Sequence, residues 1–157
     1  AGTATVSDST FTGNSATGAA GGLANGGTVT VRGSTFTGNS ASVGGGIVND
    51  GTATVSDSTY TGNSASVAGG GIANADIVMG GVRRRGTLTV RDSTFIDNSA
   101  GVAGGGIDNA GTATVRGSTF TGNTAGSGNG GLANEPDGLL TQFDNQFIDD
   151  QSPDVFP

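Results

Sequence analysis

The sequence predicts an all-β protein, a right-handed parallel β-helix (a solenoid) with three strands per coil and about six coils of 24–25 residues. The first observation is a repeat, because a Ser-Thr-aromatic element recurs with spacings of 25, 24, 35 and 25 residues. Its aromatic residues are Phe11, Phe36, Tyr60, Phe95 and Phe120. The second is local: each repeat alternates β-branched and small residues and is rich in Gly, which disfavours helix and favours strand. Parallel strands about 4.8 Å apart, joined by right-handed crossovers, satisfy both observations.

Each repeat contains three extended segments. The first has the pattern Gly-Gly-Ile-x-Asn, as at residues 45–49, and the second has the pattern Thr-x-Thr-Val, as at residues 52–55. The third is Ser-Thr-aromatic-Thr-Gly-Asn, as at residues 34–39. One segment of each kind per coil predicts three strands that stack on their copies in the next coil.

The repeat also predicts the domain organisation. We expect one β-helix domain over residues 1–157, with regular coils over 1–134 and an insertion at 75–85 that accounts for the spacing of 35. Residues 145–150 repeat the pattern of 93–98, so 135–157 is expected to hold a degenerate last coil and an irregular C-terminal cap.

Alternation along the segments predicts which side chains are buried. Val, Ala, Leu and Ile columns and the aromatic column are expected to fill the interior as ladders of like residues. Two Asn columns are expected to cap turns, because Asn tolerates left-handed backbone geometry and bonds its own kind along a stack. They are Asn14, Asn39, Asn63, Asn98 and Asn123, and Asn25, Asn49, Asn74, Asn109 and Asn134.

Composition limits the partners. The formal net charge of −7 argues against a nucleic-acid partner, and no stretch approaches the roughly 18 apolar residues of a membrane span. The chain contains no Cys and no His. Thiolate metal sites are therefore excluded. The C-terminal acids Asp144, Asp149, Asp150 and Asp154 could bind Ca²⁺, but such acids more often solvate a cap, so the sequence predicts no metal and no cofactor.

The pairing of Gly45-Gly46-Ile47 with Phe36-Thr37-Gly38-Asn39 in one period resembles the repeats of chlamydial polymorphic outer-membrane proteins. It is similar as well to the wider set of bacterial surface β-helix proteins. The resemblance covers roughly residues 1–134 and implies a non-enzymatic scaffold, adhesin-like protein or assembly subunit at the cell surface or outside the cell.

An alternative function is ice binding. Outward Thr-x-Thr pairs recur in five coils, and this chain is similar in that respect to antifreeze β-helices. Alternate residues on a strand lie about 6.8 Å apart and coils about 4.8 Å apart, a grid close to an ice lattice. The expected ladder is Thr3, Thr5, Thr28, Thr30, Thr52, Thr54, Thr87, Thr89, Thr112 and Thr114. Thr also simply favours exposed strands, so the ladder is compatible with a structural role.

A third function is that of a carbohydrate-active β-helix enzyme, which would need clustered carboxylates on one face. The candidates are Asp8, Asp57 and Asp92, beside Arg32, Arg91 and Arg116. Stacked opposite charges more simply form surface ion pairs. Without His or Lys the general bases reduce to Asp, Glu135 and Tyr60, and Tyr60 belongs to the aromatic column. We therefore expect no enzyme and no catalytic residue.

Two features predict contacts with a partner. The first is the insertion, which the repeat does not require, because loops that leave a rigid scaffold often carry specific contacts. Since it ends in three arginines, we expect it to contact an acidic or anionic surface. Its candidate residues are Ile77, Val78, Met79, Arg83, Arg84 and Arg85. The N-terminal coil has no capping element, so we expect it to bind a protein partner or a second copy head to tail.

Overall fold

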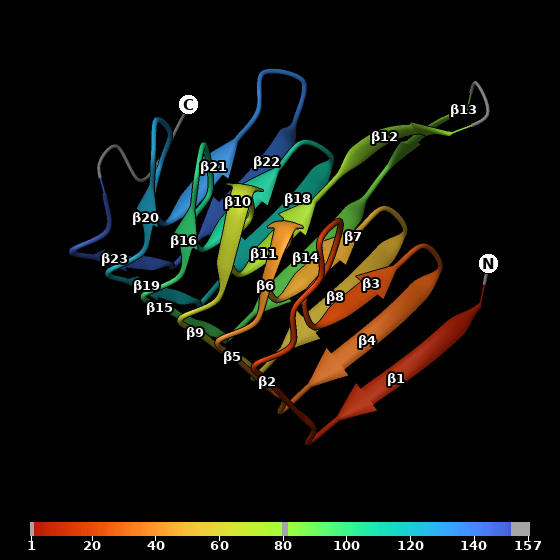
Figure 1. The fold of residues 1–157 in the computed structure, drawn as a ribbon, viewed down its shortest axis with the longest axis horizontal. Coiled ribbons are helices and arrows are strands. Elements are labelled where there is room, and N and C mark those ends of the chain that lie inside the picture. The colour runs from red at the N-terminus through yellow and green to blue at the C-terminus, as the bar shows by residue number, and fades with distance from the viewer. Residues whose placement is uncertain (1, 80–81, 152–157) are drawn as a thin grey trace.

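The protein is a parallel β-helix whose coils follow one another from the N-terminal to the C-terminal end (Figure 1). The computed structural model describes residues 2–79 and 82–151, with side chains for 2–75 and 83–151. These residues form 23 short strands and no helix. The predicted fold class is confirmed.

Three sheets hold the three predicted strands of each coil. Sheet A consists of β1 (Thr3–Ser7), β4 (Thr28–Arg32), β8 (Thr52–Ser56), β14 (Thr87–Arg91), β18 (Thr112–Arg116) and β22 (Leu139–Phe143). Sheet B consists of β2 (Thr10–Thr12), β5 (Thr35–Thr37), β9 (Thr59–Thr61), β15 (Thr94–Ile96), β19 (Thr119–Thr121) and β23 (Gln146–Ile148). Sheet D consists of β3 (Leu23–Asn25), β7 (Ile47–Asn49), β11 (Ile72–Asn74), β17 (Ile107–Asn109) and β21 (Leu132–Asn134).

A fourth, shorter sheet lies between sheets B and D and was not expected. Sheet C consists of β6 (Ser40–Val43), β10 (Ser64–Ala68), β16 (Ser99–Ala100) and β20 (Thr124–Ala125). Its register shifts between Ala65 and Ala68. These Ser-Ala segments carry little of the Val, Ile and aromatic content that marks a strand in a sequence, which explains why the pattern missed them.

The interior consists of ladders of like side chains. The six aromatic rings of sheet B form one continuous stack, with successive ring centroids 4.6–4.9 Å apart. Val31, Ile47 and Phe36 are fully buried, and so are their counterparts in the middle coils. In the first coil Ala4 is exposed and Phe11 is only half-buried, whereas their register partners Val29 and Phe36 are buried.

The buried Asn columns form hydrogen-bonded ladders along the solenoid, as predicted. The side-chain amide of Asn39 donates to Oδ1 of Asn63 at 2.9 Å and to the carbonyl oxygen of Phe11 at 2.9 Å. The backbone N–H of Asn39 donates to the same Oδ1 at 3.0 Å. In the second column the side-chain amides again bond along the stack, with Asn49 donating to Oδ1 of Asn74 at 2.8 Å. Each coil thereby satisfies the polar groups of the next, which burial requires.

The glycine directly before Ile or Leu in each Gly-Gly-Ile or Gly-Gly-Leu segment allows the aromatic stack to pack closely. A Cβ on Gly71 would lie 2.5 Å from the carbonyl oxygen of Gly106 and 3.0 Å from the ring of Phe95. The equivalent glycines Gly22, Gly46 and Gly106 also lie against an aromatic ring. The motif therefore reflects close packing, because only a residue without a side chain fits between coil and ring.

The predicted insertion forms an antiparallel hairpin, β12 (Asp76–Met79) and β13 (Val82–Arg85). It leaves the coils between β11 and β14 and projects away from them (Figure 1). The degenerate sixth coil is present as β22 and β23, which pair in parallel with β18 and β19. Residues 152–157 of the predicted cap lie outside the described residues.

Candidate functional site

The outer surface of sheet A carries the predicted threonine array, hereafter the threonine face. Parallel pairing brings Thr3, Thr28, Thr52, Thr87 and Thr112 into one row, in direct register. A second row consists of Thr5, Thr30, Thr54, Thr89 and Thr114, and Thr141 of β22 extends it. The first row ends at Leu139, which replaces Thr in the sixth coil.

Alternation fixes the direction of these side chains. In β4, Val29 and Val31 are buried while Thr28 and Thr30 are exposed. The same alternation holds in β8 and β14, where Thr52 and Thr87 are exposed and Thr54 and Thr89 are half-buried. Because every strand of sheet A keeps one register, the hydroxyl and methyl groups form a regular array two residues wide.

Sheet B presents a second, less regular array of Thr. Thr59 and Thr61 flank the buried Tyr60, but Ile96 replaces the second Thr in the next coil. In the sixth coil the flanking residues are Gln146 and Ile148, and Ile148 is exposed. The interruption at Ile96 leaves sheet A as the more regular of the two faces.

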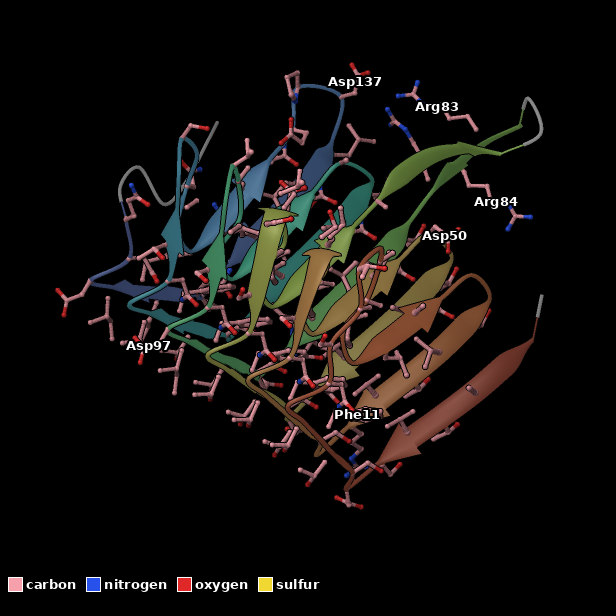
Figure 2. The ribbon with its side chains drawn as sticks, viewed as in Figure 1. Phe11, Asp50, Arg83, Arg84, Asp97 and Asp137 are labelled. Atoms are coloured by element: carbon pink, nitrogen blue, oxygen red, sulfur yellow. The ribbon has the colours of Figure 1, made fainter. Side chains whose placement is uncertain are left out.

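The hairpin is connected to a loop of the last coils by an ion pair. Nη2 of Arg83 lies 3.2 Å from Oδ2 of Asp137, in the loop between β21 and β22, and both side chains are mostly exposed. Figure 2 shows Arg83 and Arg84 on the projecting hairpin. Arg84 and Arg85 are also exposed. The side chains of Ile77, Val78 and Met79 lie outside the described part of the chain, so partner binding by the insertion stays a prediction.

The carboxylate column considered for catalysis occupies the turn between sheets A and B. Asp8, Asp57 and Asp92 have positive φ angles of 48°, 52° and 49°. The same turn position holds Gly33 and Gly117 in other coils, with φ of 56° and 59°. Asp is one of the few residues with a side chain that tolerate this geometry, so the column is explained by the turn. Of the expected ion pairs, Nε of Arg32 lies 4.0 Å from Oδ2 of Asp57, and both side chains are exposed.

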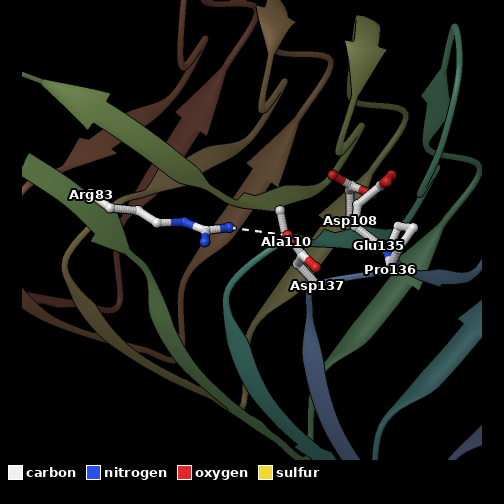
Figure 3. A pocket seen from close by; sticks show the side chains of 6 residues that line it. All are labelled: Arg83, Asp108, Ala110, Glu135, Pro136 and Asp137. Carbon is white, nitrogen blue, oxygen red and sulfur yellow. Dashed lines mark hydrogen bonds and ion pairs between the residues drawn. The ribbon is translucent and has the colours of Figure 1, made fainter. Parts of the chain in front are cut away.

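A pocket of about 470 Å³ lies between the hairpin and the last coils and was missed by the sequence analysis. We call it the acidic pocket; it is lined by Arg83, Asp108, Ala110, Glu135, Pro136 and Asp137 (Figure 3). Asp108 is only 7% exposed. Burial, and secondarily the charge of Glu135 and a hydrogen bond to it, raise the pKa of Asp108 to about 7.

A signal for this pocket exists in the repeat. The register partners of Asp108 in sheet D are Ala73 and Ala133, and further along the column Val48 and Ala24. An acid in a column of small apolar residues departs from the pattern, and Glu135 comes one residue after the last Asn of its ladder. A comparison of repeats column by column would have found it.

A serine ladder was also missed. The backbone N–H of Ser34 donates to Oγ of Ser58 at 3.2 Å, and that hydroxyl donates to the carbonyl oxygen of Ser56 at 2.8 Å. Ser93 and Ser118 continue the column, which ends at Oδ1 of Asn145. Its role is structural, because the buried hydroxyls connect one coil to the next.

The described acidic side chains show no metal-binding arrangement. Within residues 2–75 and 83–151, no group of three or more Asp, Glu, His or Cys side chains lies close enough to hold a metal ion. The C-terminal acids Asp144 and Asp149 occupy left-handed turn positions, with φ of 56° and 53°. Asp150 receives the last bonds of the first Asn ladder. In the same described part, no helix is long and apolar enough to cross a membrane.

Comparison with known proteins agrees with this architecture. No curated protein and no solved structure is significantly similar to the chain. A family described as the right-handed β-helix region matches residues 1–145 of the 157, that is, every strand from β1 to β22, and the match ends directly before β23. The stacked coils, the continuous ladders and this match together show that the chain belongs to the right-handed β-helix family.

Proposed function

We propose that this chain is a non-enzymatic structural scaffold, adhesin-like or an assembly subunit, that acts at the cell surface or outside the cell. The observation that carries the proposal is the Asn ladder, which joins every coil to the next through side-chain hydrogen bonds that are buried at all but the first joint. Together with the aromatic stack it makes a stiff solenoid that holds its outer faces in register.

The repeat supports the location. The Gly45-Gly46-Ile47 and Phe36-Thr37-Gly38-Asn39 segments resemble those of chlamydial polymorphic outer-membrane proteins and other bacterial surface β-helices. In this chain those segments supply the close-packed glycine, the stacked ring and the ladder amide of one coil. A scaffold of this kind needs no catalytic group, since regular coils alone set its length and stiffness.

We infer that assembly uses the N-terminal coil. Oδ1 of Asn39 accepts two hydrogen bonds from Asn14, one from its backbone N–H and one from its side-chain amide. Oδ1 of Asn14 is the equivalent acceptor in the first coil. Ala4 and Asn14 are exposed, so a further coil, from a protein partner or a second copy, can stack there head to tail.

The test is association in solution. We expect sedimentation velocity to show concentration-dependent association of the parent chain. Ala4→Arg, which places a charge on the stacking surface of the first coil, abolishes it. Thr12→Arg is the matched control, because Thr12 is exposed on the outer face of sheet B in the same coil. A parent chain that stays monomeric up to millimolar concentration would count against the assembly subunit.

The second candidate function is ice binding by the threonine face. The specific observation in its favour is the unbroken register of the two Thr rows across β1, β4, β8, β14 and β18. We expect Thr54→Tyr to abolish thermal hysteresis, whereas Thr61→Tyr on sheet B leaves it unchanged. A parent protein without thermal hysteresis eliminates this candidate.

A further inference from the structure

Asp108 is a buried acid that the fold does not require. It lies on β17, and its column holds Ala73 and Ala133 in the two adjacent coils. Asp108 is 7% exposed and is therefore buried, as Ala73 and Ala133 are. A buried carboxylate costs free energy unless it is paired and hydrogen-bonded. Since Ala occupies the same position in the adjacent coils, the repeat itself supplies no hydrogen-bond donor for this acid.

The two oxygens of Asp108 have different surroundings. Oδ1 is buried and has no hydrogen-bond partner among the described residues. The carboxyl group also shares a hydrogen bond with Glu135, whose charge together with burial disfavours the ionised form of Asp108. The pair is therefore rich in acceptors and short of donors, and a cationic donor between the two carboxyls would satisfy both.

The cation nearest to the pair is engaged elsewhere. Arg83 lines the acidic pocket, but its guanidinium contacts Asp137, 3.2 Å away. Figure 3 shows the Asp108 and Glu135 carboxyls side by side, with Arg83 directed to Asp137. Asp108, Glu135 and Asp137 thus face the pocket against one arginine, so its charge is negative. Pro136 and Ala110 add an apolar wall.

We propose that the acidic pocket binds the guanidinium group of an arginine presented by a partner protein, with Asp108 and Glu135 as its acceptors. A guanidinium is planar and carries five donors in a fixed fork, which suits two adjacent carboxyls. The ring of Pro136 and the methyl group of Ala110 can contact its apolar face. A metal ion fits less well, because within the described residues no three acidic side chains come close enough to coordinate one.

Binding is coupled to a proton. The guanidinium favours the ionised form of Asp108, so the carboxyl proton leaves to the solvent as the ligand enters. The charged groups that line the pocket around Asp108 are Glu135, Asp137 and Arg83. Affinity therefore rises with pH as Asp108 ionises, and it falls with added salt because the pocket is open to solvent.

The experiment titrates the protein with N-acetyl-arginine amide at pH 6 and pH 8, and follows the carboxyl carbons of Asp108 and Glu135 by ¹³C NMR. Calorimetry in two buffers of different ionisation enthalpy counts the protons released. We expect both carboxyl signals to move, a Kd of roughly 1–10 mM for this single group, tighter binding at pH 8, and proton release at pH 6.

Three comparisons make the test specific. Asp108→Ala restores the residue of the adjacent coils, so it is expected to fold, which a thermal melt checks, and to weaken binding at least tenfold. Asp50→Ala is the matched control, because Asp50 directly follows Asn49 as Glu135 directly follows Asn134 but does not line the pocket, and it leaves binding unchanged. N-acetyl-lysine amide and Ca²⁺ are expected to bind more weakly than the arginine probe. Unchanged affinity in Asp108→Ala, or tighter binding of lysine or Ca²⁺, would overturn the proposal.

Discussion

Asn123 donates two hydrogen bonds to a single carboxylate oxygen of Asp150, one from its backbone N–H at 2.6 Å and one from its side-chain amide at 2.7 Å. In the preceding coils the acceptor is the amide oxygen of the next Asn, such as Asn123 for Asn98. Asp supplies the same acceptor but has no amide to donate further. The last residue of the column therefore ends the ladder chemically while keeping its geometry.

Replacing Asp150 with Ala is expected to lower the free energy of unfolding by about 1–3 kcal/mol, because two buried donors of Asn123 lose their acceptor. Urea denaturation followed by far-UV circular dichroism measures the change. Asp149→Gly is the control, since Asp149 has positive φ and Gly122 holds the equivalent position one coil earlier. An Asp150→Ala variant as stable as the parent would show that the ladder end contributes little.

Tyr60→Phe is expected to stabilise the protein by about 1 kcal/mol. The Tyr60 ring is fully buried in the aromatic stack, and its hydroxyl has no hydrogen-bond partner among the described residues. Burial also raises the pKa of this hydroxyl, so it stays neutral. Removing a buried unpaired hydroxyl recovers its desolvation cost. Thermal melts of Tyr60→Phe and of the reverse change Phe95→Tyr should move in opposite directions; a lower melting temperature for Tyr60→Phe contradicts the prediction.

Asp108→Ala is expected to change how stability depends on pH. The pKa of Asp108 is about 7 in the folded protein against an ordinary value of 3.8, so between these values the folded state holds a proton that the unfolded chain releases. Stability from this group is therefore present at acidic pH and decreases as pH rises from about 4 to 7. At about 1.36 kcal/mol per pKa unit, Asp108 lowers the free energy of unfolding of the parent by at most about 4 kcal/mol over this pH range, and the Asp108→Ala variant lacks this decrease. Urea denaturation of both proteins at pH 4 and pH 8 measures it, and parallel pH curves would refute it.

Gly71→Ala is expected to destabilise the protein by about 3 kcal/mol. The new methyl group would meet the carbonyl oxygen of Gly106 and the ring of Phe95, and a stack held in register on both sides cannot move away. Gly18→Ala is the control, because nothing lies within 4 Å of the position of its Cβ. We expect that control to stay within about 0.5 kcal/mol of the parent in the same denaturation experiment.

Much of the fold could be predicted because its stabilising contacts occur between copies of one residue. Phe36 stacks on Tyr60 and Asn39 bonds Asn63, so one period in the sequence specifies both the neighbours and their contacts. Sheet C escaped prediction because Ser40–Val43 pairs through its backbone and carries no strong strand former at its start. The turn role of Asp57 escaped because a φ angle is not visible in a residue type that also serves in ion pairs.

The acidic pocket, by contrast, could not be predicted from the repeat. Asp108, Glu135 and Arg83 come from three separate segments, and the hairpin that brings Arg83 to Asp137 is an insertion outside the repeat. Periodicity says nothing about where such an insertion points. The threonine face lies between these cases, since its register could be predicted from the sequence and what it contacts could not.

The Asn ladder also bears on how such a protein changes in evolution. Every joint between the first five coils uses the same amide donors and acceptors, as the bonds from Asn39 to Asn63 and from Asn63 to Asn98 illustrate. A coil can therefore be duplicated or deleted as one genetic unit without leaving a buried amide unmatched. The number of coils can then vary while the cross-section of the solenoid stays the same. The exception is the neighbourhood of Asp108 and Glu135, where two particular coils must remain adjacent.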